Sequence, residues 1–206
     1  MEWTVLVPVK ALPGAKSRLA GLSADADAHA RLVRALRDDT LRAAREASGV
    51  ARLLRIGDSP EVEHDLLQRG RGLNAALAEG ARLARERWPT DGVAALVSDL
   101  PALTAVELAS TLAAAAAQAT GFVADAAGIG TTLLTARPGA AFTPQFGPGS
   151  AARHGAYATA LPAGAGLRQD VDTAADLHAA LLLGVGPDTV AALASAIHAD
   201  GASWVP

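Results

Sequence analysis

The chain has 206 residues, of which 50% are hydrophobic and 19% charged, and its formal net charge is -3. This length suits one α/β domain with a sizeable core, and the weak negative charge excludes a nucleic-acid binder that depends on a basic field. The lack of cysteine excludes disulfides, zinc–thiolate sites and thiol nucleophiles. The first residues lack the pattern of a signal peptide, and no apolar stretch reaches the ~18 residues that span a bilayer. We therefore expect a cytoplasmic protein without membrane or nucleic-acid partners.

Short apolar runs alternate with amphipathic segments in the first half of the chain. The expected strands are residues 4–9, 52–56 and 93–97, and the expected helices are residues 27–47, 73–87 and 104–117. Pro8 fits best near the end of the first strand, because proline cannot donate a ladder hydrogen bond. The alternation predicts βαβ units, a mostly parallel sheet and a Rossmann-like three-layer α/β/α fold, in a single domain over residues 1–206.

The second half of the chain has shorter and less regular segments. The expected strands there are residues 121–126, 131–135 and 167–171, and the expected helices are residues 150–160, 173–183 and 187–199. A polar stretch between the second strand and the second helix suggests one more short helix at residues 62–68.

A cationic loop follows the first strand. Lys10, Lys16 and Arg18 lie around Gly14, which allows the backbone to approach a ligand closely. Ammonium and guanidinium groups beside backbone N–H groups suit a polyphosphate. The Walker pattern GxxxxGK[ST] and the dinucleotide pattern GxGxxG are both absent. A basic surface loop without a ligand is the alternative.

Three carboxylates follow apolar segments further along the chain. Asp99 comes directly after the third expected strand, and Asp170 and Asp172 are two residues apart, so their side chains point the same way on extended backbone. Ligands of open α/β sheets bind at the carboxyl ends of the strands. Oxygen ligands without a histidine or cysteine cluster suit magnesium. The alternative for Asp172 and its neighbour Thr173 is N-capping of the next helix.

The segment FGPGS precedes the helix expected at residues 150–160. Thr132, Gly147 and Ser150 offer hydroxyls and adaptable backbone near its start, and a helix N-terminus is a reasonable anion site. An ordinary capped helix is the alternative. His154 is the one histidine near this segment, and we expect it to be a surface helix residue. No histidines have the spacing of metal ligands, and the GxSxG pattern of a catalytic serine is absent.

Six motifs occur in a fixed order: VPVKALPGAKSRL, GLNAALAEG, SDLPAL, GTTLL, FGPGSAARH and DVDTAADL. Together, over residues 4–183, they resemble the guanylyltransferases of deazaflavin coenzyme (F-420) biosynthesis. These enzymes act on phosphoenolpyruvate or 2-phospholactate. The resemblance implies their fold, which is of the nucleotide-diphospho-sugar transferase type.

The resemblance also implies an activity, the magnesium-dependent transfer of GMP from GTP to the phosphate of a small phospho-acid with release of pyrophosphate. By motif, the nucleotide-binding residues would be Lys10, Gly14, Lys16, Arg18 and Asn74. The metal ligands would be Asp99, Asp170 and Asp172, and the phosphoenolpyruvate-binding residues would be Thr132, Gly147 and Ser150. GTP and the phospho-acid are the implied partners, and a homodimer is compatible with the chain.

Several alternatives stay open at the level of sequence. The Ala/Arg-rich composition suggests a bacterial chain and favours phosphoenolpyruvate over 2-phospholactate, with 3-phosphoglycerate as a third acceptor. Another nucleotidyltransferase of the same fold, such as a molybdopterin cytidylyltransferase, is the second enzyme hypothesis. A nucleotide-binding domain without turnover is the third, and the presence of all three carboxylates argues against it.

Overall fold

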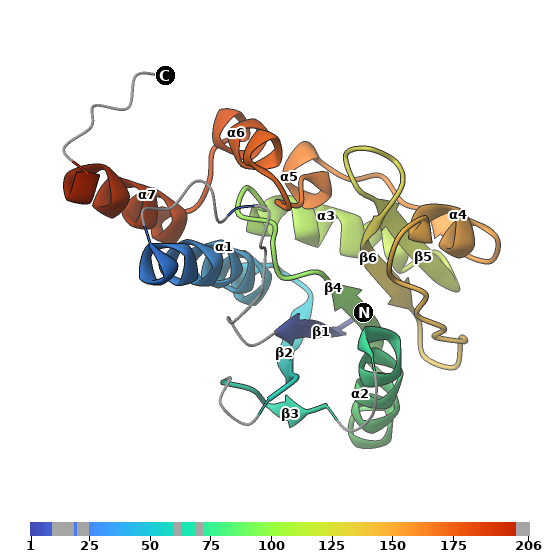
Figure 1. The fold of residues 1–206 in the computed structure, drawn as a ribbon. Coiled ribbons are helices and arrows are strands. Elements are labelled where there is room, and N and C mark those ends of the chain that lie inside the picture. Colours follow the sequence, from blue (N-terminus) through green and yellow to red (C-terminus); the bar gives the residue numbers. More distant parts are fainter. Residues whose placement is uncertain (10–18, 20–24, 60–62, 69–71, 201–206) are drawn as a thin grey trace.

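The computed structural model describes residues 1–9, 19, 25–59, 63–68 and 72–200, with side chains as far as residue 195. Within this part of the chain, seven strands form one sheet in the order β3-β2-β1-β4-β6-β5-β7 (Figure 1). They are β1 (Trp3–Val9), β2 (Val50–Gly57), β3 (Leu66–Leu67), β4 (Gly92–Leu96), β5 (Thr120–Ala124), β6 (Thr131–Ala136) and β7 (Thr159–Ala160).

Most neighbouring strands run in parallel. β1 is parallel to β2 and β4, β3 is parallel to β2, and β7 is parallel to β5, whereas β6 is antiparallel to both β4 and β5. The prediction of a mostly parallel sheet is therefore confirmed. The ladder between β1 and β4 ends at Leu6, so Pro8 lies beyond it and its missing N–H costs that ladder nothing.

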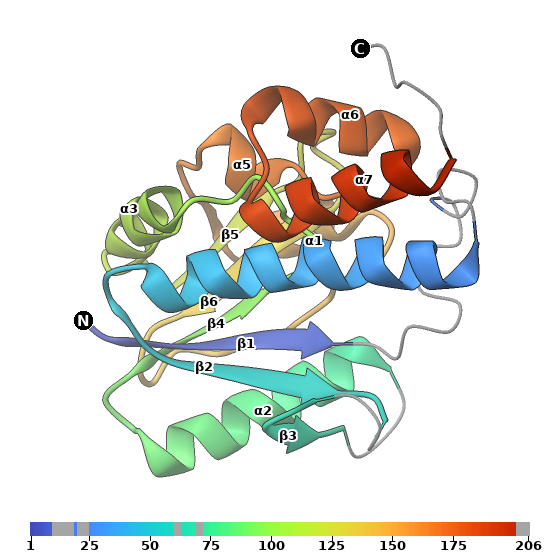
Figure 2. The same cartoon turned by 90° about the vertical axis from the view of Figure 1, so that its left-hand side faces the viewer.

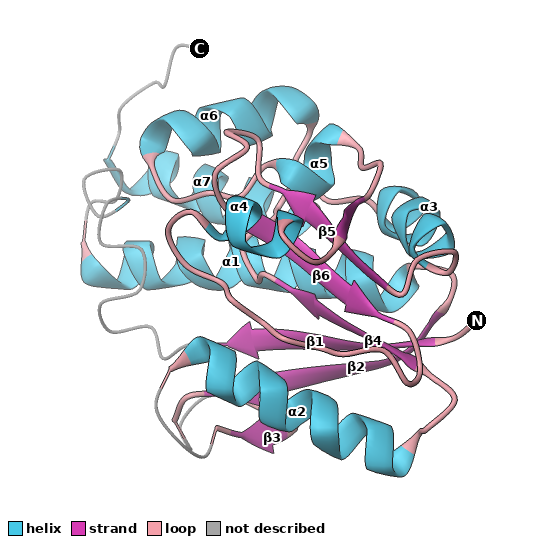
Figure 3. Cartoon of the chain, turned by 90° about the vertical axis from the view of Figure 1, so that its right-hand side faces the viewer, coloured by secondary structure: helices cyan, strands magenta, loops and turns pink. Residues whose placement is uncertain are grey.

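Helices cover both faces of the sheet. They are α1 (Ala26–Glu46), α2 (Leu73–Arg87), α3 (Ala105–Ala115), α4 (Ser150–Gly155), α5 (Ala165–Arg168), α6 (Ala174–Leu183) and α7 (Pro187–Asp200). α1, α3 and α5 pack on one face, in a core that includes Val7, Leu96 and Leu112 (Figure 2). α2 and α4 pack on the other face, around Leu6 and Phe146 (Figure 3). None of these helices combines the length and the apolar character that crossing a bilayer requires, in the residues for which the structure is described.

α1 connects the sheet to an outer layer. Asp25 caps its first turn by accepting a hydrogen bond from the N–H of Ala28 at 2.7 Å. Leu41 packs toward the sheet. Leu32 and Leu36 belong to a separate small core with residues of α6. α7 then lies alongside α1, on the outside of the molecule (Figure 2).

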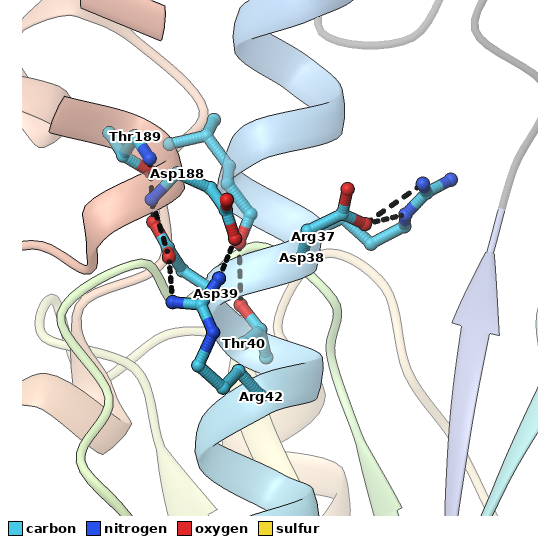
Figure 4. Close-up of polar contacts among 8 residues, drawn as sticks. Arg37, Asp38, Asp39, Thr40, Arg42, Asp188 and Thr189 are labelled. Atoms are coloured by element: carbon cyan, nitrogen blue, oxygen red, sulfur yellow. Dashed lines mark hydrogen bonds and ion pairs between the residues drawn. The ribbon is translucent and has the colours of Figure 1, made fainter. Parts of the chain in front are cut away.

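Asp39 of α1 caps the start of α7. Its carboxylate is 4% exposed and accepts hydrogen bonds from the backbone N–H groups of Asp188, at 3.0 Å, and Thr189, at 2.8 Å (Figure 4). Arg42 forms ion pairs with both Asp39, at 2.9 Å, and Asp188. Because a negative charge is favourable at a helix N-terminus and this one has charged and backbone partners, its burial is compensated.

One expected helix is absent. Of residues 62–68, the described part is not helical and contains β3, in which Leu66 pairs with Ile56 of β2. The outer edge of β2 offers backbone groups that need partners, and this edge pairing overrides the local helical preference of the polar stretch.

Two expectations in the second half are also wrong. The strand expected at residues 167–171 does not form: residues 167–168 belong to the short helix α5, and residues 169–171 have no regular structure. The Gly166 N–H of α5 donates to the carboxylate of Glu107 at 3.0 Å. The helix expected at residues 150–160 ends at Gly155, and the chain then pairs with the free edge of β5 as β7. The other expected strands and helices are confirmed, with ends that differ by a few residues.

A glycine at the start of β4 makes room for Trp3. A Cβ atom at Gly92 would lie 2.5 Å from two ring carbons of Trp3, whose side chain is 1% exposed. Gly92→Ala should therefore lower the free energy of unfolding, measured in urea, by about 1–3 kcal/mol, the usual cost of overpacking. In the matched control Gly155→Ala, the added Cβ meets Phe122 at an ordinary 3.5 Å, and the change should stay within about 0.5 kcal/mol. Equal stability of the two variants would contradict this account.

Candidate active site

The parallel strands β1, β2 and β4 all end at one edge of the sheet (Figure 2). The SDLP segment, residues 98–101, follows β4 at this edge. The DVDT segment lies against it, because the N–H of Val171 donates to the carbonyl of Asp99 at 3.0 Å. Asp170 and Asp172 flank Val171, so the structure brings the backbone of all three predicted metal ligands to one place, where open α/β sheets bind their ligands.

N-capping, the alternative for Asp172 and Thr173, is confirmed for Thr173. Thr173 is the N-cap of α6: its side chain accepts a hydrogen bond from the N–H of Asp176 at 3.3 Å, and Asp176 accepts one from the N–H of Thr173 at 2.8 Å. This reciprocal pair is a capping box. Asp172 is therefore not the N-cap residue, and its side chain is exposed at the surface.

The carboxylates do not form a complete metal cage by themselves. No group of three or more His, Cys, Asp or Glu side chains is gathered so that it could hold a metal, among the residues that the structure describes. Magnesium, however, is commonly bound by one or two carboxylates together with substrate phosphates. Asp99 and the DVDT aspartates supply oxygen donors of that kind, so the residues present fit a site that the substrate completes. The magnesium role of Asp99, Asp170 and Asp172 stays a prediction.

The predicted acceptor residues lie on β6 and in the FGPGS segment. The carbonyl of Thr132 accepts a hydrogen bond from the N–H of Val97 at 3.0 Å, which places Thr132 beside the SDLP segment. Its side chain is 1% exposed, and its hydroxyl has no hydrogen-bond partner among the described residues. A buried hydroxyl without a partner is costly, so this one has the capacity to bind a polar ligand. Ser150 is equally buried, at 1% exposed.

Two glycines give the FGPGS segment its shape. Gly147 has a φ of 123° and Gly149 a φ of 72°, a region that other residues adopt at a cost. The N–H of Ser150 then donates to the carbonyl of Gly147 at 3.0 Å and closes a tight turn at the start of α4. The positive φ of Gly147 explains why glycine is needed at this position. Its predicted role in acceptor binding stays a prediction.

Asn74 joins the predicted nucleotide side to the predicted acceptor side. Its side-chain Nδ2 donates to the carbonyl of Phe146 at 3.1 Å, and its Oδ1 accepts from the N–H of Phe146 at 2.7 Å. The amide therefore pairs with both backbone groups of one residue in the FGPGS segment. The structure assigns Asn74 a positioning role, and its predicted contact with the nucleotide stays a prediction.

Arg153 of α4 holds the same segment through a second set of hydrogen bonds. Its guanidinium donates to the carbonyls of Pro148 at 2.6 Å, Gln145 at 2.9 Å and Gly147 at 3.3 Å. The carbonyl of Gly147 also accepts from the N–H of Ser150. One planar guanidinium with five donors adds a second donor there and supplies partners for the carbonyls of Pro148 and Gln145.

His154 is buried, so the expectation of a surface residue is wrong. Its ring is 0% exposed and lies among Phe122, Phe146 and Tyr157. Burial, with a smaller contribution from the charge of Arg153, lowers the pKa of His154 from 6.5 to about 4.

The hydrogen bonds of His154 define its neutral form. The backbone N–H of Gln145 donates to Nε2 at 2.9 Å, and Nδ1 lies 2.8 Å from the hydroxyl oxygen of Thr131. Since the N–H of Gln145 can only donate, Nε2 is unprotonated and Nδ1 carries the proton. If Nε2 were protonated, its N–H would face the N–H of Gln145, and two donors would lie in contact. His154 thus ties the FGPGS segment to β6 and is not available as a general base.

Four predicted site residues, Lys10, Gly14, Lys16 and Arg18, lie outside the described residues, and their nucleotide role stays a prediction. Sequence reasoning named Asn74 and His154 but missed their positioning roles, and it missed Arg153 as a site residue. Asn74, Arg153 and His154 act through contacts with backbone groups that are distant in sequence, or on the far side of a turn, and no local pattern signals such a contact.

Solved structures of other proteins share this fold. A nucleotide-diphospho-sugar transferase structure from Desulfovibrio desulfuricans G20 superimposes with a TM-score of 0.71 at 17% identity, covering 97% of this chain and 96% of that one. The structure of 4-diphosphocytidyl-2C-methyl-D-erythritol synthase gives a TM-score of 0.56 at 14% identity, covering 88% and 97%. The fold is therefore that of the nucleotide-diphospho-sugar transferases, as predicted. No protein-family model matches the chain.

Sequence relatives narrow this class. A phosphoenolpyruvate guanylyltransferase from Streptomyces scabiei is 48% identical, covering 94% of this chain and 97% of its own. Enzymes of the same name from Thermomonospora curvata and Geodermatophilus obscurus are 46% and 47% identical, covering 93% and 97% of this chain and 88% and 97% of their own. The chain belongs to the phosphoenolpyruvate guanylyltransferase family.

The lowered pKa of His154 predicts a stability that depends on pH. The folded pKa of about 4 lies below the unfolded value of 6.5, so the contribution is complete above pH 6.5 and is lost as the pH falls toward 4. Between pH 7.5 and 5.0 this histidine should remove about 2 kcal/mol from the free energy of unfolding.

Urea unfolding at these two pH values measures the loss. His154→Gln should be less stable at pH 7.5 and should lack this part of the pH dependence. His178→Gln is the control, because His178 is exposed on α6, and it should keep the full dependence. A wild-type pH dependence in His154→Gln would show that the histidine is not the titrating group.

Proposed function

We propose that this chain transfers GMP from GTP to the phosphate of phosphoenolpyruvate and releases pyrophosphate, as a step of deazaflavin coenzyme (F-420) biosynthesis. The observation that carries the proposal is the 48% identity with a phosphoenolpyruvate guanylyltransferase over nearly the whole of both chains. The geometry is compatible with it, because the SDLP, DVDT and FGPGS segments lie at or beside the ligand-binding edge of a nucleotidyltransferase fold.

The chemistry explains why the site contains no activated histidine. A phosphate oxygen of the acceptor is already anionic at neutral pH, so it can attack the α-phosphorus of GTP without losing a proton to a base. A new bond forms between that oxygen and the α-phosphorus, and the bond between the α-phosphorus and the bridging oxygen of pyrophosphate breaks. The main barrier is repulsion between two polyanions, which positioning and cationic groups reduce.

Different residues would bind the two substrates. Lys10, Lys16 and Arg18 would neutralise the triphosphate, in line with the sequence motif. The buried hydroxyls of Thr132 and Ser150 would bind the acceptor. Hydrogen bonds to such hydroxyls orient a phospho-acid and exclude water from around it.

Magnesium belongs to the same proposal. Asp99, Asp170 and Asp172 would hold it, together with phosphate oxygens of the nucleotide. When bound, the ion would act as a Lewis acid that neutralises charge on the α-phosphate. The aspartates themselves contribute fixed negative oxygens at the end of β4 and before α6, and their backbones are joined by the hydrogen bond between Val171 and Asp99.

A pyrophosphate-release assay tests the reaction. With magnesium present, GTP, CTP and ATP are each crossed with phosphoenolpyruvate, 2-phospholactate and 3-phosphoglycerate. We expect the highest kcat/KM for GTP with phosphoenolpyruvate. Asp99→Asn should lower kcat at least about 100-fold, since a metal contact is worth several kcal/mol. Glu86→Gln, on the exposed end of α2, should leave activity unchanged.

Each other result has a definite meaning. Release with CTP and none with GTP would favour a cytidylyltransferase of the same fold. The absence of release with every pair would exclude the enzyme hypothesis. Normal turnover of Asp99→Asn at limiting magnesium would remove Asp99 from the metal site.

The pairing of Asn74 with Phe146 predicts a change in acceptor binding. Asn74→Ala removes both hydrogen bonds that hold the FGPGS segment against α2, so the KM for phosphoenolpyruvate should rise about tenfold, the effect of losing a well-placed interaction of about 1.4 kcal/mol. Arg85→Gln is the control. It removes another bond from α2 to the same long loop, at Ala140, far from the FGPGS glycines. A KM for phosphoenolpyruvate that rises equally in both variants would contradict a specific role of Asn74.

A further inference from the structure

A buried threonine in the middle of α1 contacts the candidate active site. Thr40 is 0% exposed, and its hydroxyl donates to the carbonyl of Leu36 at 2.9 Å, the usual bond of a helical threonine to the preceding turn. The same oxygen accepts a hydrogen bond from the backbone N–H of Leu100 at 2.9 Å. Leu100 directly follows Asp99, so the hydroxyl connects α1 to the SDLP segment.

Thr40 and Val171 hold the same peptide group from opposite sides. The peptide between Asp99 and Leu100 presents its carbonyl to the N–H of Val171, at 3.0 Å, and its N–H to the hydroxyl of Thr40, at 2.9 Å. In a trans peptide these two groups point in opposite directions. The two bonds therefore fix the rotation of the peptide plane next to the Cα of Asp99, and with it the direction of the Cα–Cβ bond.

The rest of the SDLP segment is held as well, but without this effect on Asp99. The carbonyl of Leu100 accepts from the N–H of Leu103 at 3.0 Å, and the carbonyl of Pro101 accepts from the N–H of Gly186 at 2.9 Å. Both bonds lie beyond the Asp99–Leu100 peptide. The adjacent residue of α1, Asp39, is directed instead to α7 (Figure 4). Thr40 is thus the part of α1 that acts on the orientation of Asp99.

We infer that Thr40 is a positioning residue for Asp99, which sets the direction of that carboxylate through the N–H of Leu100. The inference rests on the proposed function, in which Asp99 binds the metal that accompanies the nucleotide. Leu100 is 0% exposed, so water does not replace a lost partner of its N–H, and the peptide has to rotate to find one. A displacement of about 1 Å in a reacting group is enough to reduce turnover strongly.

Thr40→Val is the direct test, because valine keeps the shape and removes the hydroxyl. We expect kcat for pyrophosphate release to fall about tenfold or more, and the magnesium concentration for half-maximal rate to rise. The KM for phosphoenolpyruvate should change less than about twofold, since the FGPGS segment has its own supports. Thr40→Ser retains the hydroxyl and should restore both parameters nearly to the wild-type values.

Thr111→Val is the matched control for the loss of one buried hydrogen bond. Thr111 is 1% exposed, and its hydroxyl donates to the carbonyl of Pro162 at 2.9 Å, without contact to the SDLP segment. Its urea midpoint should fall as in Thr40→Val, whereas kcat and the magnesium dependence should stay at wild-type values. Wild-type kinetics in Thr40→Val, or the same kinetic loss in Thr111→Val, would overturn the inference.

Two further measurements separate other outcomes. If Thr40→Val does not fold, the pair Thr40→Ser and Thr40→Ala carries the same prediction, because both lack the methyl group and only serine has the hydroxyl. If the wild type releases no pyrophosphate, the proposed function has failed. The hold of Thr40 on the N–H of Leu100 is then tested by amide hydrogen exchange. Faster exchange of the Leu100 N–H in Thr40→Val, and not in Thr111→Val, supports this role of Thr40, and unchanged exchange overturns it.

Discussion

The hydrogen bond from the N–H of Val171 to the carbonyl of Asp99 joins the last third of the chain to the centre of the sheet. Val171 and Leu100 are fully buried, and a buried backbone group without a partner is costly. The groups at the end of β4 therefore need partners from elsewhere in the chain, and α1, the DVDT segment and the turn before α7 supply them. The same requirement that stabilises the fold brings the backbones of Asp99, Asp170 and Asp172 to one edge of the sheet.

Backbone groups in and next to the FGPGS segment also need hydrogen-bond partners, and here side chains supply them. Two glycines with positive φ allow its shape. The hydrogen bond inside the turn, from the N–H of Ser150 to the carbonyl of Gly147, leaves other backbone groups at and before the turn in need of partners. Asn74 from α2, Arg153 from α4 and the neutral ring of His154 provide those partners. A segment held in this way needs little reorganisation when an anionic ligand binds, which favours tight and oriented binding.

The regular elements were predictable where one periodic pattern was long enough. The leucines of α1, the GLNAALAEG stretch of α2 and the buried runs of β1 and β4 all form the elements that their patterns predict. The short elements were not predictable. β3 exists because β2 has an open edge, and α5 forms where Glu107 accepts the N–H of Gly166. In each case the partner that decides the structure lies outside the local sequence.

The sequence alone determined the fold class, the family and the residues at the ends of the strands, because alternating apolar segments and six ordered motifs are local properties of the chain. Only the tertiary structure decided how these residues are supported. The burial of His154, the pairing of Asn74 with Phe146 and the contact of Thr40 with Leu100 each join residues that packing brings together. The physical reason is that buried polar groups need hydrogen-bond partners. A group finds its partner among the residues that lie near it in space, and these cannot be read from the order of residues along the chain.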